Sequence, residues 1–268
     1  LLVDGLLAIY FLVVTCLQNA GVNSSIGASA AGPANLTVNG TLRYVGTGGS
    51  TDRQFTLGTS GGTLDASGTG IIEFTSTSPV TLAGANTART LTLTGTNTGY
   101  NLFAGQLDNN GPGVSSLTKT GTGTWRLTNN NSTYTGVTRI NGGVLSVDQM
   151  ANGGVASSIG ASSGAAANLV IGNGSTLRYT GAGDTTNRQF TLDTGVTFIE
   201  SSGTGALQFT NTGAVALTGT NTARTIALGG TNTGANTMGG AIGNNGTGAT
   251  TLAKNDSGTW ILTGNNTY

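Results

Sequence analysis

The sequence predicts an all-β protein folded as a parallel β-solenoid, on three observations. Glycine supplies 47 of the 268 residues and charged residues only 7%, where globular proteins average about 7% glycine and about 25% charged residues. Short segments alternate between apolar and polar residues, which is the pattern of half-buried strands. Most of the sequence after residue 17 occurs twice in the same order, which is typical of repeat proteins that bury a core by stacking their units.

The first element is an apolar segment at residues 1–17, centred on Leu6–Leu17 (LLAIYFLVVTCL). These twelve residues are too few to cross a bilayer as a helix, which takes about 20. Their length matches the apolar part of a truncated export signal, although Asp4 stands where basic residues are usual. A strand that caps the solenoid is the alternative. Lipid modification of Cys16 is less favoured, because Thr15 is larger than the residue usual before such a cysteine.

Two copies of one unit follow, at residues 18–150 and 151–268. The repeated segments keep their order at an offset of 133 to 135 residues: SSIGAS at 24–29 and 157–162, TLRY at 41–44 and 176–179, RQFTL at 53–57 and 188–192, NTART at 86–90 and 221–225, and GTW at 123–125 and 258–260. We therefore expect one continuous solenoid built from two copies of about 135 residues that superimpose, the second copy being incomplete.

Within each copy the strands are predicted at apolar pairs separated by one residue. Residues 89–94 (RTLTLT) place Leu91 and Leu93 on one face and threonines on the other, the period of a strand. Glycine- and asparagine-rich segments such as GTNTG supply the turns. Apolar sites recur every 16 to 19 residues, which predicts about 13 turns with stacked strands near residues 53–57, 89–94 and 124–128. No helix is expected after residue 17.

An antiparallel sandwich or barrel would show similar strands and turn signals. The solenoid is favoured because the spacing continues from the first copy into the second without a closing signal. Parallel pairing is therefore expected to dominate.

A repeat motif is recognisable in both copies. Residues 117–147 (LTKTGTGTWRLTNNNSTYTGVTRINGGVLSV) and residues 252–268 (LAKNDSGTWILTGNNTY) resemble the autotransporter-associated β-strand repeat, with Asp256 where the family has glycine. The matching positions are Leu117, Lys119, Gly121, Gly123, Leu127, Tyr134, Gly136, Thr138, Gly142, Gly143 and Leu145, and then Lys254, Gly258, Leu262 and Tyr268. The resemblance implies a right-handed β-helix of an autotransporter passenger, exported to the cell surface and usually followed by a C-terminal outer-membrane barrel, through which alone it would contact the membrane.

Composition narrows the function further. Ten basic and ten acidic residues balance, which argues against the basic surface of a nucleic-acid-binding protein. Histidine is absent, which excludes His-dependent triads and His-ligated metals. The acids are scattered, and only Asp65 recurs as an acid, Glu200. We predict no catalytic, metal or cofactor site. The expected role is a non-enzymatic passenger or adhesin segment, extracellular or on the bacterial surface, that acts as a stalk or display surface for an unknown host-cell, surface or glycan ligand.

A polysaccharide-binding or polysaccharide-cleaving β-helix enzyme is the alternative. It would require two of Asp52, Asp65, Glu73 and Asp108 to converge, because glycosidases place paired carboxylates about 5 to 9.5 Å apart.

Basic residues recur where acids do not. The arginines form three pairs across the two copies, Arg43 and Arg178, Arg53 and Arg188, and Arg89 and Arg224. They could form a ladder of cations for an anionic glycan, with Tyr44 and Tyr179 as stacking surfaces. The favoured interpretation is structural, with each arginine bound to turn carbonyls or paired with Asp65 or Glu200. Trp125 and Trp260 are expected in the core.

The ends of the solenoid carry the last expectation. The sequence stops within the second motif, at Tyr268. A terminal turn has unpaired backbone groups and an open apolar face, so the isolated chain is expected to fray there and to self-associate end to end.

Overall fold

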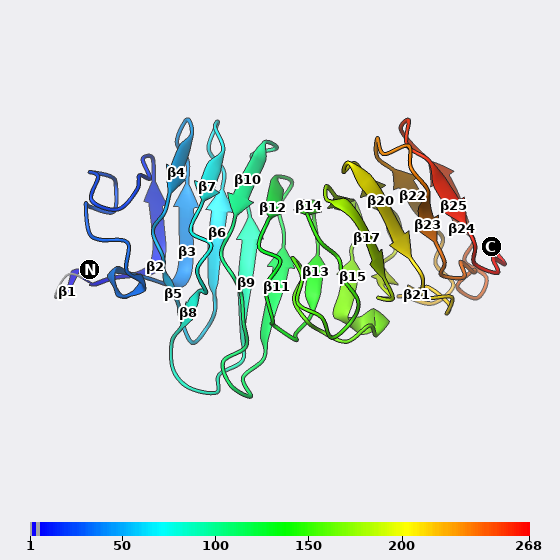
Figure 1. Ribbon diagram of the computed structural model, residues 1–268, viewed down its shortest axis with the longest axis horizontal. Helices are drawn as coiled ribbons and strands as arrows, with labels where there is room; N and C mark the ends of the chain where they lie inside the picture. Colours follow the sequence, from blue (N-terminus) through cyan, green and yellow to red (C-terminus); the bar gives the residue numbers. More distant parts are fainter. Residues whose placement is uncertain (1, 4–5) are drawn as a thin grey trace.

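The structure, a computed structural model, describes residues 2–3 and 6–268. It consists of strands joined by turns, with two single-turn 3-10 helices, η1 (Pro33–Asn35) and η2 (Ala166–Asn168). Figure 1 shows the strands lying side by side along an elongated body, with the chain termini at opposite ends. The predicted all-β fold is confirmed.

Three sheets run along the body. The twelve-stranded sheet contains β1 (Leu2–Val3), β2 (Leu6–Val14), β3 (Leu36–Tyr44), β5 (Thr56–Leu57), β6 (Gly62–Ala66), β8 (Thr81–Leu82), β9 (Arg89–Thr94), β11 (Ser115–Lys119), β13 (Thr138–Ile140), β15 (Leu169–Ile171), β18 (Thr191–Leu192) and β21 (Ala216–Leu217). The nine-stranded sheet contains β4 (Gly49–Thr51), β7 (Ile72–Phe74), β10 (Tyr100–Phe103), β12 (Thr124–Leu127), β14 (Gly143–Val147), β16 (Ser175–Tyr179), β19 (Gly195–Ser201), β22 (Arg224–Gly229) and β24 (Thr250–Lys254). The four-stranded sheet contains β17 (Ala182–Thr186), β20 (Gly205–Phe209), β23 (Asn236–Met238) and β25 (Trp260–Leu262).

The strands pair in parallel, turn upon turn, as a solenoid requires. Of the pairings between named strands in the described residues, only β1 with β2 is antiparallel. The nine strands of the second sheet correspond to about nine turns. The parallel β-solenoid is therefore confirmed.

The predicted spacing of the turns is wrong. Phe74 pairs with Phe103 and Phe103 with Leu127, which places successive turns 29 and 24 residues apart. The sequence pattern counted apolar pairs on different faces of one turn as separate turns. For the same reason residues 53–57, 89–94 and 124–128 do not stack on one another, because β5 pairs with β3 and β8, β9 with β6 and β11, and β12 lies in the other sheet.

The core follows the alternation of the strands. In β9 the side chains of Arg89, Leu91 and Leu93 are buried and the threonines between them are half-buried. Trp125 is fully buried as predicted, and its ring stacks on Phe74 with 6.3 Å between ring centroids. These columns of inward side chains form one hydrophobic core along the body.

Trp125 also hydrogen-bonds to the turn of the preceding coil, since its indole N–H donates to the carbonyl of Thr94 at 2.7 Å. Trp260 repeats this contact with Gly229 at 2.8 Å and is half-buried against the core. Both tryptophans are thus core residues, as the sequence indicated.

Corners between the faces rely on glycine or on residues that tolerate a left-handed backbone. Gly121 has φ 67° and lies against the carbonyl of Gly95 in the turn before it, so a Cβ there would meet that oxygen at 2.6 Å. Asp256 occupies the corresponding corner of the second copy with φ 56°. Its carboxylate accepts the backbone N–H of Gly230 at 2.9 Å, a bond that glycine could not make.

Repeated segments of the two copies lie in different sheets. Residues 41–44 belong to β3 of the twelve-stranded sheet, whereas the same letters at 176–179 belong to β16 of the nine-stranded sheet. Trp125 lies in the nine-stranded sheet and Trp260 in the four-stranded one. From β4 to β16 the nine-stranded sheet advances by five turns, so each copy spans five turns and one further face. The second copy therefore starts one face around the solenoid from the first.

The N-terminal apolar segment contributes strand β2 at one end of the solenoid. It pairs in parallel with β3 from Leu7 to Val14, with an irregularity between Ile9 and Phe11. Val14 is buried, whereas Phe11 is 66% exposed. The segment therefore lies in the place that the capping alternative required, and its role in export stays a prediction.

Candidate functional site

Four of the six recurring arginines are buried and bound to backbone carbonyls. Arg89 donates to the carbonyls of Leu57 at 2.8 Å and of Ala83 at 2.6 Å. Its counterpart Arg224 donates in the same way to Leu192 at 3.0 Å and Thr218 at 2.6 Å. Burial lowers the pKa of both guanidinium groups. These two arginines therefore join the corner of one turn to the strand of another.

Arg53 and Arg188 each organise a loop that contains the repeated SSIGAS segment. Arg188 donates to Met150, Gly160 and Ser162 carbonyls at 2.9 to 3.1 Å. Arg53 donates to the carbonyls of Gln18 at 3.2 Å and Gly27 at 2.8 Å. In both places a buried cation satisfies the carbonyls of an irregular loop that has no strand partner.

The other two recurring arginines lie at the surface in ion pairs. Arg43 faces Asp65 on the next strand with 3.5 Å between Nε and Oδ2, and Arg178 faces Glu200 with 2.6 Å between Nε and Oε2. All six recurring arginines thus have protein partners. The contacts account for their recurrence in structural terms, and a glycan-binding role for Arg43, Arg53, Arg89, Arg178, Arg188 and Arg224 stays a prediction.

The expected stacking surfaces at Tyr44 and Tyr179 are wrong. Both rings are buried, with 2% and 1% exposure, because they lie on the inward face of their strands. Their hydroxyl oxygens accept the backbone N–H groups of Gly48 and Gly183. Burial also raises the pKa of Tyr179.

The acids proposed for the enzyme alternative have local partners. Asp52 accepts the N–H of Ala20 at 2.8 Å, and Asp108 accepts the N–H of Thr133 at 3.0 Å. Asp65 pairs with Arg43, as described above, and Glu73 lies opposite Leu102 on the neighbouring strand. Within residues 2–3 and 6–268, no three His, Cys, Asp or Glu side chains come together as ligands for a metal ion. The described chain likewise has no helix that is long and apolar enough to cross a membrane.

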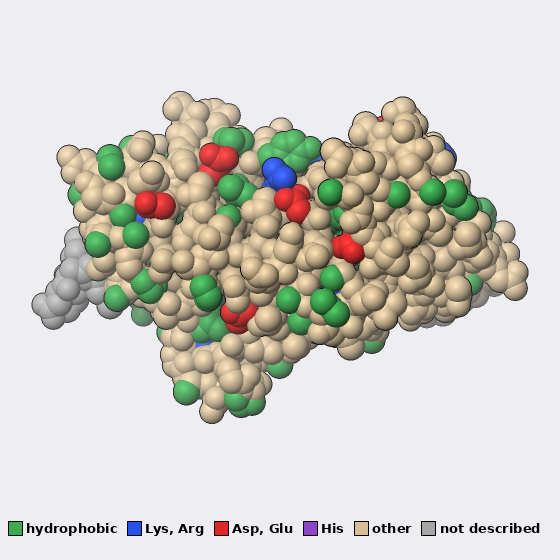
Figure 2. Space-filling view, viewed as in Figure 1, with side chains coloured by type: hydrophobic (Ala, Val, Ile, Leu, Met, Phe, Trp, Pro, Cys, Tyr) green, Lys and Arg blue, Asp and Glu red, His purple; other side chains and the backbone are tan. Residues whose placement is uncertain are grey.

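A polar hollow of about 450 Å³ lies where β14 and β16 end and β17 begins. It is lined by Asn130, Asp148, Gln149, Thr180, Gly181, Ala182, Gly183, Asp184 and Thr204. No large apolar side chain is part of this lining. Figure 2 shows how rare charged side chains are on the drawn face of the molecule, so a hollow with two carboxylates is an unusual place on this surface.

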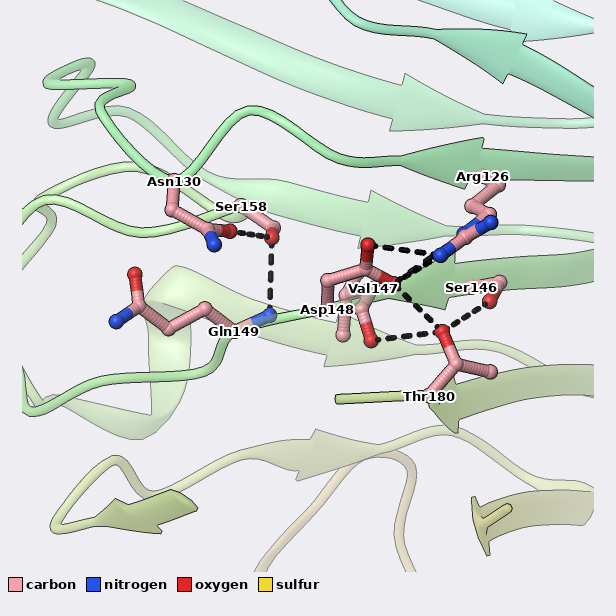
Figure 3. Close-up of polar contacts among 8 residues, drawn as sticks. All are labelled: Arg126, Asn130, Ser146, Val147, Asp148, Gln149, Ser158 and Thr180. Atoms are coloured by element: carbon pink, nitrogen blue, oxygen red, sulfur yellow. Dashed lines mark hydrogen bonds and ion pairs between the residues drawn. The ribbon is translucent and has the colours of Figure 1, made fainter. Parts of the chain in front are cut away.

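Hydrogen bonds fix the walls of the hollow (Figure 3). Arg126 holds the Asp148 carboxylate in two contacts, from Nε to Oδ1 at 3.2 Å and from Nη2 to Oδ2 at 2.9 Å. The hydroxyl of Thr180 donates to the same carboxylate at 2.7 Å. Asp184 is held from below, because its Oδ2 accepts the N–H groups of Met150 and Ala151 at 2.8 and 3.0 Å.

Two amide side chains complete the hollow. Asn130 accepts a hydrogen bond from Ser158 at 2.8 Å through its oxygen, and the same serine hydroxyl accepts the backbone N–H of Gln149 at 3.0 Å. Figure 3 draws the side-chain amide of Gln149 and the amide nitrogen of Asn130 close to each other and without hydrogen bonds to the residues shown. Both groups remain able to donate to a ligand.

An exposed aromatic ring lies on the same sheet. Tyr100, the first residue of β10, is 49% exposed. Arg178 of β16 donates from Nη1 to its hydroxyl oxygen at 3.3 Å. Burial lowers the pKa of Arg178, but the hydrogen bond and charge of Glu200 outweigh this and raise it overall. The ring is therefore held by a permanently charged group.

Sequence reasoning missed this surface because it searched for residues that recur. Tyr100, Arg126 and Asp184 face Ala235, Ile261 and Gly49 at the corresponding places of the other copy. The opposite criterion, polar or aromatic residues that break the repeat, would have found them.

Lys119 is a buried cation without a carboxylate partner among the described residues. Its Nζ donates to the carbonyls of Thr120, Gly121 and Gly142 at 2.6 to 3.0 Å. Burial lowers its pKa to about 8. Lys254 takes the same place in the second copy but is exposed, with its Nζ donating to the carbonyls of Asn255 and Asp256.

The buried position of Lys119 predicts a dependence of stability on pH. Between pH 8 and 10 the unfolded chain keeps the lysine protonated while the folded protein releases the proton, so the free energy of unfolding rises with pH. A shift of two pKa units corresponds to about 2.7 kcal/mol, which is an upper bound for the rise. We expect chemical denaturation to detect it, and Lys119→Met to remove it. An equal slope in both proteins would contradict the prediction.

Comparisons with known proteins agree with this architecture. A family model described as the passenger-associated transport repeat matches residues 117–147 and 252–268. The adhesin BmaC autotransporter of Brucella suis biovar 1 (strain 1330) is 67% identical over 256 residues, which cover 95% of this chain. The chain spans only 8% of the length of that relative. No solved structure matches.

Proposed function

We propose, from the premise that this chain is an autotransporter passenger segment with autotransporter-associated β-strand repeats, that it serves at the bacterial cell surface as a stalk and display surface of an adhesin. The observation that carries the proposal is the uninterrupted parallel stacking of about nine turns around one core. Such a body is stiff along its axis, because each turn is hydrogen-bonded to its neighbours. It can hold a binding surface at a distance from the outer membrane.

We further propose that the segment is not catalytic. The carboxylates that a polysaccharide-cleaving enzyme would need are engaged by neighbouring groups, as Asp65 is by Arg43 and Asp148 is by Arg126. The name of the relative, an adhesin, also supports binding over cleavage. The enzyme alternative has a direct test, which is the release of new reducing ends from polysaccharides incubated with the purified chain.

The same proposal covers the division of the chain. Residues 1–17 would form the N-terminal turn, and residues 18–150 and 151–268 the two repeated units of one continuous solenoid. The pairing of β14 in the first unit with β16 in the second supports this continuity.

Attachment of bacteria to a host-cell layer tests the proposed function. We expect bacteria whose passenger lacks these 268 residues to attach less than bacteria with the full passenger, because the display surface is gone. The purified chain added in excess should compete with attachment of the full passenger. Its unfolded form is the matched control and should not compete. Undiminished attachment together with absence of competition would contradict an adhesive role for this segment.

The ends of the isolated polypeptide are expected to self-associate. At one end β25 leaves Ile261 and Leu262 43% and 37% exposed, and at the other β2 leaves Tyr10 76% exposed. Terminal strands of this kind are templates for pairing with another chain. We expect light scattering to detect end-to-end oligomers of the 268-residue polypeptide, and an extension that completes the second repeat to reduce them. Equal monodispersity of both polypeptides would contradict this.

A further inference from the structure

We propose that the surface running from Tyr100 to the hollow at Asp148 binds an uncharged, hydroxyl-rich glycan. This inference deepens the proposed adhesin function and rests on it. It differs from the arginine ladder suggested by the sequence in the residues it uses and in the charge of its ligand.

The first argument is the chemistry of the hollow. Gln149 and Asn130 offer amide donors, while the carboxylates of Asp148 and Asp184 offer acceptors. A sugar hydroxyl both donates and accepts, so it can bond to a donor and an acceptor placed side by side. The walls are held by hydrogen bonds within the protein, and a preformed site loses less conformational entropy when it binds.

The second argument is the aromatic platform. Tyr100 and Arg178 lie on strands separated by β12 and β14, so their backbones are about 14 Å apart at the usual strand spacing. Their side chains can meet at 3.3 Å only if both extend along the sheet surface. Ser146, which lies between Arg126 and Arg178 in the register, has no exposed surface although it faces outward, which fits side chains lying over it. A flat, half-exposed ring can pack against the C–H face of a sugar.

The platform and the hollow form one surface. Tyr100 contacts Arg178, Arg178 and Arg126 flank Ser146 on adjacent strands, and Arg126 binds Asp148 in the wall of the hollow. An extended oligosaccharide can therefore contact the ring and the amides at the same time, whereas a single sugar cannot.

Charge decides between neutral and anionic glycans. Arg126 is neutralised by Asp148, and Arg178 by Glu200. Asp184 is held by backbone N–H groups, and among the described residues no ion pair includes it. The hollow thus carries a net negative charge, which repels sialylated or sulfated sugars.

A peptide ligand fits this surface less well. Extended peptides commonly bind by adding a strand to the edge of a sheet, but β12, β14 and β16 are each paired on both sides. The lining of the hollow also lacks the large apolar side chains that anchor peptide side chains.

The internal repeat supplies an independent argument. Asp148 and Gln149 face Thr15 and Cys16 in the first copy, and Tyr100 faces Ala235 in the second. Residues that build the solenoid recur, as the buried arginines do. The residues of this surface do not recur, so the solenoid does not require them and a separate role must account for them.

The test uses the folded 268-residue chain and defined probes. These are unbranched neutral hexasaccharides of glucose and of N-acetylglucosamine, with a sialylated and a sulfated oligosaccharide of similar length. We expect calorimetric titration to detect at least one neutral probe and neither anionic one. Tyr100→Ala should weaken that binding about tenfold and Gln149→Ala about fivefold, while Tyr100→Phe should retain most of it because the ring remains.

Matched controls separate binding from folding. Tyr10→Ala and Gln18→Ala remove an exposed tyrosine and an exposed glutamine elsewhere on the chain and should leave the affinity unchanged. All variants should unfold at the denaturant concentration of the parent chain. Failure of every neutral probe, preference for an anionic probe, or equal affinity of Tyr100→Ala and Tyr10→Ala would each overturn the inference. If the chain still competes in the attachment assay in any of these cases, the proposed function stands and the glycan inference alone fails.

Discussion

Trp125→Ala is expected to lower the free energy of unfolding by about 4 kcal/mol, the usual cost of removing a large aromatic side chain from a packed core. Trp125 is fully buried, stacks on Phe74 and donates a hydrogen bond to the carbonyl of Thr94. Its loss creates a cavity in the middle of the solenoid and removes the partner of a turn carbonyl. Urea denaturation followed by far-UV circular dichroism measures the change.

The second repeat provides the control. Trp260 makes the same backbone hydrogen bond but is half-buried in β25, at the edge of the four-stranded sheet. Trp260→Ala should therefore cost clearly less than Trp125→Ala. Equal losses would show that the shared hydrogen bond, and not core packing, determines the effect.

Arg188→Met is expected to lower the free energy of unfolding by about 3 kcal/mol, because buried hydrogen bonds to a charged group are each worth about 1.5 to 3 kcal/mol. Arg188 is 2% exposed. Its guanidinium group satisfies carbonyls of Met150, Gly160 and Ser162, which lack a replacement donor in the variant. We expect amide hydrogen exchange in residues 150–162 to accelerate before the rest of the chain unfolds.

Arg139→Met serves as the control for Arg188→Met, since Arg139 is an exposed arginine on β13. It should change the free energy of unfolding by less than about 0.5 kcal/mol. A loss at Arg188 no greater than the loss at Arg139 would refute the structural role assigned to the buried arginine.

The strands and the core were predictable because they depend on local alternation. RTLTLT predicted the burial of Leu91 and Leu93, and the same alternation placed Trp125 inside. The number of turns was not predictable, because a solenoid turn is closed by pairing between residues 20 to 32 positions apart, as Trp125 with Leu145 and Leu145 with Leu177. Apolar spacing alone does not say which of three faces a strand joins.

The surface from Tyr100 to Asp148 was hidden from the sequence for a different reason. Its residues come from β10, β12, β14 and β16, and only the register of those strands brings them to one place. The contact between Arg178 and Tyr100 joins residues 78 positions apart. The recurring arginines were predictable as a set, but their burial was not, because nothing in the local pattern distinguishes Arg53 from Arg43.

The shift of one face per copy has a consequence for how such a chain diversifies. A unit that spanned whole turns would place every duplicate of a surface residue on the same side, in a straight row. Here the duplicates of Tyr100 and Arg126 are carried around the circumference, to the four-stranded sheet where Ala235 and Ile261 now lie. Duplication therefore lengthens the rod and at the same time changes its compass direction, so each unit can acquire its own contacts on a side that the previous unit does not share.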